Sequence, residues 1–293
     1  MRIDTETRLC AVIGNPVAHS LSPAIHNAGF AASGLNYVYL AFHVEDVGAC
    51  LAGMRAMRGF RGLSVTIPHK IAIMDHLDDI EPAALRVGSV NTVTNDNGRL
   101  IGASTDGPGT LRAFAEAGVS LEGRKVLFLG AGGAARAVAF AVAEEAAPAC
   151  ITILGRTVSR AAALAADVQG ATGVAVTYGG LEAVGAAVAA HDVLIQATPV
   201  GMHGHAEAAS PVPAGCLKSR HVVFDMVYRP LKPRLILEAE AAGCTTILGL
   251  EMLLNQAVLQ YQRWTGVDAP VAAMRRALLE ALGAASTEGN VDS

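Results

Sequence analysis

The sequence predicts an α/β protein of two domains. Short β-branched or apolar runs alternate with longer Ala- and Leu-rich stretches at helical period, a pattern typical of repeated βα units and mostly parallel sheets. A chain of 293 residues is long for one compact unit and short for three. A break near residue 105, followed by a fresh series of apolar runs, divides it. We therefore expect one α/β domain over residues 1–105 and a second over residues 106–249.

Each predicted domain has its own series of strands. A first series ends in a hairpin, which the Asn97-Gly98 dipeptide indicates. Helices over 251–264 and 270–282 follow no further strand, so we expect residues 250–285 to complete the first domain, and the polar stretch 286–293 to be a disordered tail. The expected strands lie at 9–13, 37–42, 63–67 and two within 90–104, then at 126–129, 151–154, 174–177, 193–196, 222–225 and 246–248.

Composition favours a small-molecule partner in a reducing compartment. The 22 basic and 26 acidic side chains give a net charge of −4, which argues against nucleic acid as a partner. Five cysteines, widely spaced and without a CxxC pair, suggest neither a disulfide framework nor a zinc site. No apolar run approaches the ~20 residues of a membrane span, and the N-terminus lacks the layout of a secretion signal. We expect a soluble, cytoplasmic protein.

A glycine-rich turn marks a candidate dinucleotide site. In the stretch 125–136, an apolar strand runs directly into glycines and then into an Ala-rich helix. Gly130 suits the tight turn, Gly132 lets backbone amides approach a pyrophosphate, and Ala135 permits close packing of helix on strand. A plain glycine turn is the alternative. The strand before and the helix after favour a Rossmann-type nucleotide-binding domain.

The end of the next strand selects the cofactor. An acidic residue there would bind the ribose hydroxyls of NAD, whereas an arginine neutralises the 2′-phosphate of NADP. This chain has Arg156 and Thr157 at that place, with Arg160 shortly after, and no Asp or Glu. We therefore expect NADP, held by these three residues. Solvated surface arginines are the alternative.

Polar side chains follow two strands of the first domain. Ser20 and Ser22 come after the first strand, and Ser22-Pro23 is typical of the N-cap and first position of a helix, a positive end that suits a substrate carboxylate. A capping serine with no further role is the alternative. Lys70 follows the third strand closely, and a lysine there can exchange a proton with a substrate when a carboxylate, here Asp106, holds it in place. Surface charges are the alternative for both.

Side by side, these segments resemble the shikimate dehydrogenase family. The similarity extends from Val12 to Gln256, with motifs in the family's order and spacing: GNPVAHSLSP, SVTIPHK, VNT, TDG, GAGGAAR, GRT, FDMVY and GLEMLLNQA. The resemblance implies an N-terminal substrate domain with a mainly parallel sheet and a Rossmann-type NADP-binding domain. It also implies reversible oxidation of shikimate to 3-dehydroshikimate, in the biosynthesis of aromatic amino acids.

The resemblance further implies roles for individual residues. Lys70 and Asp106 would be the catalytic pair, with Lys70 exchanging the hydroxyl proton and Asp106 orienting it. Residues expected to hold the substrate are Ser20, Ser22, Thr66, Asn91, Tyr228 and Gln256. Residues expected to hold NADP are Gly130, Ala131, Gly132, Gly133, Ala134, Arg156, Thr157, Arg160, Met226 and Gly249.

Four departures from the family's common pattern accompany these matches. Ser64 stands where many members have Asn before Val-Thr, Ser104 replaces the Asn of Asn-Thr-Asp-Gly, Gly155 replaces the Asn of Asn-Arg-Thr, and Pro199-Val200 alters a loop. Two rival activities stay open: a quinate or aminoshikimate dehydrogenase of the same superfamily, and a noncatalytic NADP-binding sensor. We expect no metal, because the histidines show no metal-binding spacing, and we expect either a monomer or a homodimer.

Overall fold

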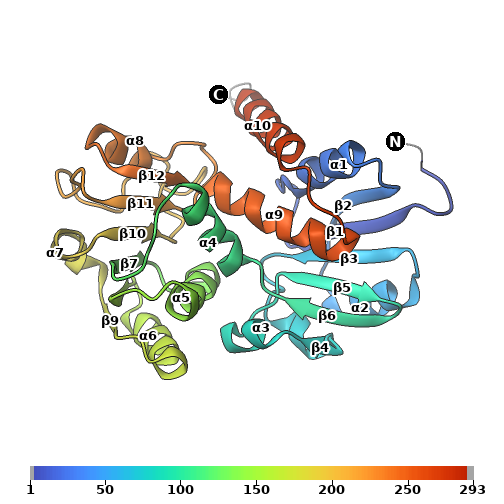
Figure 1. Cartoon of the computed structure of the whole chain (residues 1–293), viewed down its shortest axis with the longest axis horizontal. Coiled ribbons are helices and arrows are strands. Elements are labelled where there is room, and N and C mark those ends of the chain that lie inside the picture. The colour runs from blue at the N-terminus through green and yellow to red at the C-terminus, as the bar shows by residue number, and fades with distance from the viewer. Residues whose placement is uncertain (1–2, 289–293) are drawn as a thin grey trace. The chain divides into compact units, whose positions relative to one another are not determined.

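The structure, a computed structural model, describes residues 3–288, with side chains up to residue 283 (Figure 1). The described residues form two compact units. The first unit contains the residues up to Thr105 and those from Leu254 on, and the second unit is Asp106–Leu253. Both units are α/β, so the predicted fold class is confirmed. Of the predicted tail 286–293, the first three residues continue the last helix, and 289–293 lie outside the described residues.

A six-stranded mixed sheet forms the centre of the first unit, in the order β2-β1-β3-β5-β6-β4. β1 pairs in parallel with β2 and β3, whereas β5 is antiparallel to both β3 and β6. The β5–β6 turn carries Asn97 and Gly98 with φ of 53° and 95°, which confirms the predicted hairpin. The strands are β1 (Arg8–Gly14), β2 (Tyr37–His43), β3 (Phe60–Val65), β4 (Asp79–Ile80), β5 (Thr92–Asp96) and β6 (Arg99–Ala103).

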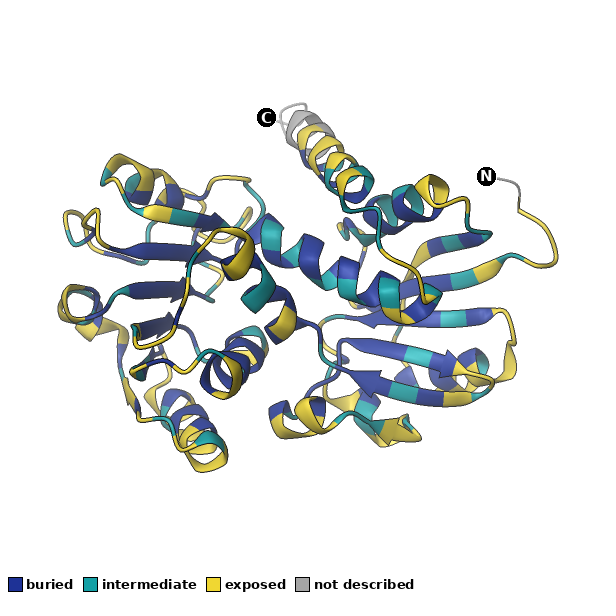
Figure 2. Ribbon diagram, viewed as in Figure 1, coloured by how far each residue is buried: buried dark blue, intermediate teal, exposed yellow. Residues whose placement is uncertain are grey.

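The two faces of this sheet bury different side chains, because successive residues of a strand point to opposite faces. Leu63 and Val65 join an apolar core with helices on one face, while Gly62 and Ser64, which alternate with them, face the other. Figure 2 shows the central strands of this sheet coloured mostly as buried. There the Gly62 backbone lies against the ring of Trp264. The helices of this unit are α1 (Ser22–Ala32), α2 (Val47–Ala56), η1 (Ala72–His76), α3 (Pro82–Val87), α9 (Gly249–Thr265), which begins in the second unit, and α10 (Val271–Glu288).

The second unit is built on a fully parallel six-stranded sheet. Its order, β12-β11-β10-β7-β8-β9, reverses direction between β7 and β10, which is the Rossmann arrangement that the sequence predicts. The strands are β7 (Lys125–Leu129), β8 (Cys150–Leu154), β9 (Val176–Gly179), β10 (Val193–Gln196), β11 (Val222–Asp225) and β12 (Thr245–Leu248). The helices are α4 (Asp106–Glu116), α5 (Gly133–Glu145), α6 (Val158–Thr172), η2 (Leu181–Ala183), α7 (Val184–Ala190) and α8 (Arg234–Ala241).

One strand begins later than predicted. The sequence placed it at 174–177, but β9 starts at Val176. Gly173 ends α6 in a left-handed conformation (φ 74°), and the two residues after it carry the chain from helix to sheet. The chain passes between the units twice, at the Thr105–Asp106 peptide and within α9. Within residues 3–288, no helix has both the length and the apolar character needed to span a membrane.

The packing of Trp264 on Gly62 gives a stability prediction. A Cβ at position 62 would lie 2.4 Å from the indole, closer than any real contact. We expect Gly62→Ala to lower the free energy of unfolding by about 1–3 kcal/mol, because overpacking forces backbone and ring apart. Chemical denaturation would measure it, with Gly59→Ala, where a Cβ meets only Thr7 O at 3.6 Å, as the control. Equal stability of the two variants would contradict the assigned packing.

Candidate functional site

The turn after β7 leaves its backbone open to a ligand. Gly130 has φ of 112°, and a Cβ there would lie 2.8 Å from the carbonyl oxygen of Ala197, so only glycine fits. At Gly132 and Gly133, by contrast, a Cβ would meet no atom within 4 Å. Gly132 caps α5 without any side-chain hydrogen bond. Space above bare backbone amides at a helix start is what a pyrophosphate requires, so the turn fits a dinucleotide.

The two arginines after β8 have exposed side chains. Arg156, Thr157 and Arg160 are all exposed at the carboxyl end of β8 and the start of α6. Among the described residues, neither arginine forms an ion pair with a carboxylate. A guanidinium without an acidic partner suits a phosphate monoester, which offers it two oxygens at once. Gly155, one of the departures, leaves only ordinary contacts around the space of a Cβ.

Met226 and Gly249 meet at the same edge of the parallel sheet. A Cβ at Gly249 would lie 2.6 Å from the carbonyl oxygens of Met226 and Val227, so α9 begins in direct backbone contact with the end of β11. Tyr228 follows two residues after Met226 and is half-buried, and burial raises the pKa of its hydroxyl. It therefore stays protonated at neutral pH and can donate a hydrogen bond.

A buried glutamine shapes the loop that contains Pro199-Val200. Gln196, at the end of β10, is fully buried. Its Nε2 donates to Thr198 Oγ1 (2.9 Å) and to Val200 O (3.1 Å), and its Oε1 accepts from Thr198 N (3.1 Å). These bonds hold the loop at the carboxyl end of the sheet, near the reversal of strand order.

Asp225, the last residue of β11, is a buried carboxyl that the sequence analysis missed. It is fully buried, its Oδ1 accepts from Val227 N (2.9 Å), and its Oδ2 has no hydrogen-bond partner among the described residues. Burial raises the pKa of Asp225 to about 7, against the weaker effect of the Val227 bond. The FDMVY motif contains it, but no pattern of neighbouring residues indicates that this carboxyl is buried.

In the first unit, Ser20 and Ser22 lie together at the start of α1. The prediction that Ser22 is the N-cap is wrong by one residue: Leu21 is the N-cap, and Ser22 is the first helical residue. The reason is that Ser20 provides the cap-like contact instead, since its Oγ accepts from Ser22 N (3.3 Å). Both hydroxyls remain half-buried at the positive end of the helix.

The segments with Thr66, Lys70 and Asn91 are joined by backbone hydrogen bonds. Thr66 N donates to Ile13 O (3.0 Å), which continues the sheet beyond β3. Val90 N donates to Lys70 O (2.8 Å), which places Lys70 beside the segment that carries Asn91. These three predicted residues therefore lie at one edge of the first sheet, where open α/β sheets bind ligands.

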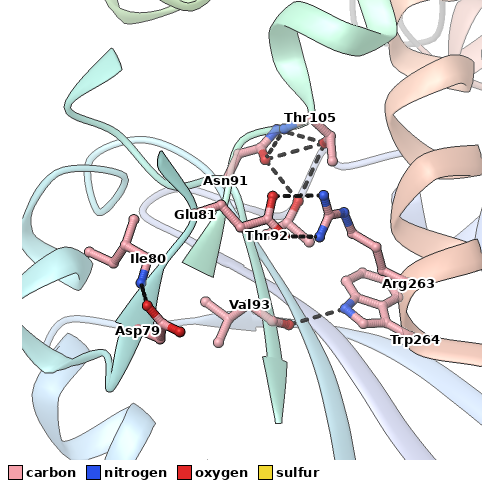
Figure 3. Close-up of polar contacts among 9 residues, drawn as sticks. All are labelled: Asp79, Ile80, Glu81, Asn91, Thr92, Val93, Thr105, Arg263 and Trp264. Carbon is pink, nitrogen blue, oxygen red and sulfur yellow. Dashed lines mark hydrogen bonds and ion pairs between the residues drawn. The ribbon is translucent and has the colours of Figure 1, made fainter. Parts of the chain in front are cut away.

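Asn91 is tied to the residue that precedes Asp106. Asn91 Oδ1 accepts from Thr105 N (2.8 Å), and Asn91 Nδ2 lies 3.0 Å from Thr105 Oγ1 (Figure 3). Asp106 follows as the first residue of α4 and is buried, and its carbonyl accepts from Thr110 Oγ1. Asp106 is the next residue after Thr105. Because consecutive Cα atoms are about 3.8 Å apart, the backbone of Asp106 lies close to the contact between Asn91 and Thr105. The TDG motif contains Thr105, but the sequence analysis assigned this residue no role.

The remaining predicted ligand, Gln256, is half-buried on α9, and Met252, one turn earlier, is a core residue. Of the two serine departures, Ser64 is buried and hydrogen-bonded inside the first unit, whereas Ser104 is half-buried. In the described part of the chain, no three His, Cys, Asp or Glu side chains are arranged to bind a metal ion.

Comparison with known proteins assigns the family. The shikimate dehydrogenase substrate binding domain matches residues 12–93, the shikimate / quinate 5-dehydrogenase family matches 113–209, and the shikimate 5′-dehydrogenase C-terminal domain matches 249–279. The shikimate dehydrogenase (NADP(+)) of Moorella thermoacetica is 45% identical over 98% of this chain and 97% of its own. The chain belongs to the shikimate dehydrogenase family.

Solved structures of the family share the fold. Shikimate 5-dehydrogenase of Thermus thermophilus in complex with NADP(H) and shikimate is 39% identical, with a TM-score of 0.84 over 94% of this chain and 100% of its own. Quinate dehydrogenase of Corynebacterium glutamicum in complex with NAD is 32% identical, with a TM-score of 0.88 over 94% of this chain and 99% of its own. The Rossmann-type arrangement of the second unit is thus a family property.

The exposed arginine after β8 gives a prediction for cofactor binding. We expect Arg156→Ala to raise the KM for NADP roughly 10- to 100-fold, because a charge-assisted hydrogen bond contributes ~1.5–3 kcal/mol. The KM for NAD, which lacks the 2′-phosphate, should stay unchanged. Steady-state kinetics with both cofactors measures this, and Arg58→Ala, an exposed arginine of the first unit, is the control. Equal losses with NADP and NAD would refute phosphate recognition by Arg156.

Asp225 gives a prediction for pH dependence. Its pKa is about 7 in the folded protein and ~3.9 in an unfolded chain. Between these pH values the folded protein keeps a proton on Asp225 that the unfolded chain releases. The stability that the protein has with Asp225 protonated is therefore fully present below pH 4 and is lost as pH rises through 7. Asp225→Asn, which cannot ionise, should therefore raise Tm relative to wild type more at pH 8 than at pH 5, by roughly 5 °C.

Thermal unfolding at both pH values measures this difference. Asp75→Asn, at an exposed position, serves as the control for loss of a surface charge. The same change in Tm at pH 5 and pH 8 for Asp225→Asn would show that the carboxyl does not gain its proton on folding.

Proposed function

We propose that this chain catalyses the reversible, NADP-dependent oxidation of shikimate to 3-dehydroshikimate, a reaction of aromatic amino acid biosynthesis. The proposal rests on two sheet edges that are suited to bind ligands, in a chain of this family. One is the glycine turn of the second unit, whose backbone is open to a ligand and which lies at the same sheet edge as the exposed arginines after β8. The other is the strand edge that carries Lys70, Asn91 and the Thr105–Asp106 joint.

The second unit holds the cofactor. Backbone amides at the start of α5 donate to the pyrophosphate, where the helix dipole also favours negative charge. Arg156 pairs with the 2′-phosphate, supported by Thr157 and Arg160. When bound, NADP supplies the acceptor for the hydride that leaves the substrate carbon. The turn residues in this role are Gly130, Ala131, Gly132, Gly133 and Ala134, and Met226 and Gly249 line the end where β11 meets α9.

The substrate is a small acid with several hydroxyl groups, and six side chains match that chemistry. Hydroxyl donors at a positive helix end suit a carboxylate, as Ser20 and Ser22 provide. Asn91 and Gln256 offer carboxamides, which can donate to or accept from a hydroxyl group. Thr66 and Tyr228 complete the set, and Tyr228 keeps its proton because burial raises its pKa.

Proton transfer falls to Lys70 and Asp106. In the oxidation, the O–H bond of the reacting alcohol breaks and its proton passes to the Lys70 amine, and in the reduction Lys70 returns it. Asp106 pairs with Lys70, holds it in place and orients it toward this hydroxyl. Because the two groups are coupled, the pair rather than either residue is the acid–base unit. A noncatalytic NADP-binding sensor would have no need for both groups.

Quinate is the rival substrate, because the chain also resembles a quinate dehydrogenase and departs from the family pattern at Ser64. The structure of that relative is a complex with NAD, whereas the arginines after β8 favour NADP here. We further propose a cytoplasmic enzyme, consistent with five free cysteine thiols, in the form of a monomer or a homodimer.

The test compares wild type with Lys70→Ala on shikimate and on quinate, by following NADPH formation. Wild type should show the higher kcat/KM with shikimate. Lys70→Ala should lower kcat by ~10²–10⁴-fold with a modest change in KM, because proton-transfer groups contribute about that much. A much higher kcat/KM for quinate would overturn the substrate, and an unchanged kcat in the variant would overturn the role of Lys70.

A further inference from the structure

His69, the residue before Lys70, is tied by its side chain to another part of the first unit. It is buried, with 6% of its surface exposed. Its Nε2 lies 2.8 Å from the carbonyl oxygen of Val44, which follows β2. A carbonyl oxygen can only accept a hydrogen bond, so Nε2 has the proton and donates to Val44. The chain just before the proposed proton-transfer residue is therefore attached to the end of a strand that is not its neighbour in the sheet.

The acceptor of this hydrogen bond has a fixed position. Val44 N donates to Gly14 O (3.3 Å), at the end of β1, which lies between β2 and β3 in the sheet (Figure 1). Two residues after Val44, the carboxylate of Asp46 caps α2 by accepting from Ala49 N (2.8 Å). Because Val44 is held by the sheet on one side and by α2 on the other, its carbonyl oxygen offers His69 a rigid point of attachment.

The turn after β3 packs directly on the end of β1. A Cβ at Gly14 would lie 2.5 Å from Thr66 Cγ2, so the turn lies against bare backbone there. Asn15 N donates to Ile67 O (3.0 Å), and His69 N donates to Thr66 O (3.0 Å). Both hydrogen bonds are backbone to backbone, so they would form with other side chains in the turn.

Backbone hydrogen bonds also hold the chain on the far side of His69. Val90 N donates to Lys70 O (2.8 Å), and Ile73 N donates to His69 O (3.0 Å) as the chain turns into η1. Of the hydrogen bonds described here for this turn, the one to Val44 is therefore the one that requires a particular side chain. An apolar side chain at position 69 could fill the same space, but it would leave the Val44 carbonyl without this donor.

We propose that His69 is a positioning residue, which fixes the backbone of Lys70 at the edge of the first sheet. The proposal rests on the proposed function, in which Lys70 exchanges a proton with the substrate. Proton transfer requires the two heavy atoms to come within ~2.6–3.2 Å of each other, so a small displacement of Lys70 lowers the rate. A misplacement of about 1 Å can cost about 100-fold. His69 acts through Lys70 and does not itself exchange the proton.

The test compares two replacements of His69 in the full-length enzyme. His69→Phe keeps an aromatic ring and removes the donor, whereas His69→Gln retains an N–H near the position of the imidazole Nε2. We expect His69→Phe to lower kcat about 10- to 100-fold, with the KM for NADP within about twofold of wild type, because the displaced group acts in the chemical step. His69→Gln should retain most of the wild-type kcat. His43→Phe, at an exposed position of β2, is the control and should change neither value.

A double variant separates positioning from a general loss of structure. If His69 acts through Lys70, adding His69→Phe to Lys70→Ala should lower kcat by less than about twofold further. Fully multiplicative effects, equal losses in His69→Phe and His69→Gln, or a lowered Tm with an unchanged kcat would each overturn the proposal. Should His69→Phe fail to fold, His69→Asn takes its place, because its carboxamide ends near the position of Nδ1 and is too short to reach Val44.

Lys70→Ala distinguishes this proposal from the proposed function. A wild-type kcat in His69→Phe, together with a lowered kcat in Lys70→Ala, would refute the role of His69 alone. An unchanged kcat in Lys70→Ala would refute the role of Lys70 and with it that of His69. The assays use whichever of shikimate and quinate the wild type oxidises, and inactivity of the wild type on both would refute the proposed function and this proposal together.

Discussion

The proposed substrate site depends on the hydrogen bonds between Asn91 and Thr105. They join the chain just before β5 to the chain just after β6, at the point where the first unit ends and α4 begins. Asp106 is the next residue, and the neighbouring Val90 bonds the backbone of Lys70. The proposed ligand and both proposed proton-transfer residues are thus anchored to one short stretch of buried polar structure. Displacing Asn91 would disturb all three.

Buried polar groups are handled in opposite ways in the two units. In the first unit, the buried hydroxyl groups of Ser64 and Thr92 each accept one side-chain hydrogen bond and donate another, so desolvation is offset and the side chains keep one arrangement. Asp225, by contrast, has one oxygen without a partner, and its pKa rises to about 7 in response. Satisfied networks fix geometry, whereas an unsatisfied carboxyl makes stability depend on pH.

The glycine turn and the exposed arginines of the second unit could be predicted from sequence because their signals are local. Gly130, Gly132 and Arg156 sit directly after strands, and the conformation of a short turn depends on the residues within it. The N-cap of α1 was predicted one residue late, because the choice between Ser20 and Ser22 as the capping group depends on contacts that local pattern does not specify. The buried state of Asp225 was missed for the same reason.

The sequence by itself determined the α/β class, the Rossmann-type second domain and the resemblance to the family. Only the tertiary structure decided which buried polar side chains of the first unit bind one another. Ser64 and Gln260 are 196 residues apart and meet through packing of α9 on the sheet. Pattern and propensity act over a few residues, whereas the direction of a buried hydrogen bond depends on which distant donor and acceptor the fold brings within 3 Å.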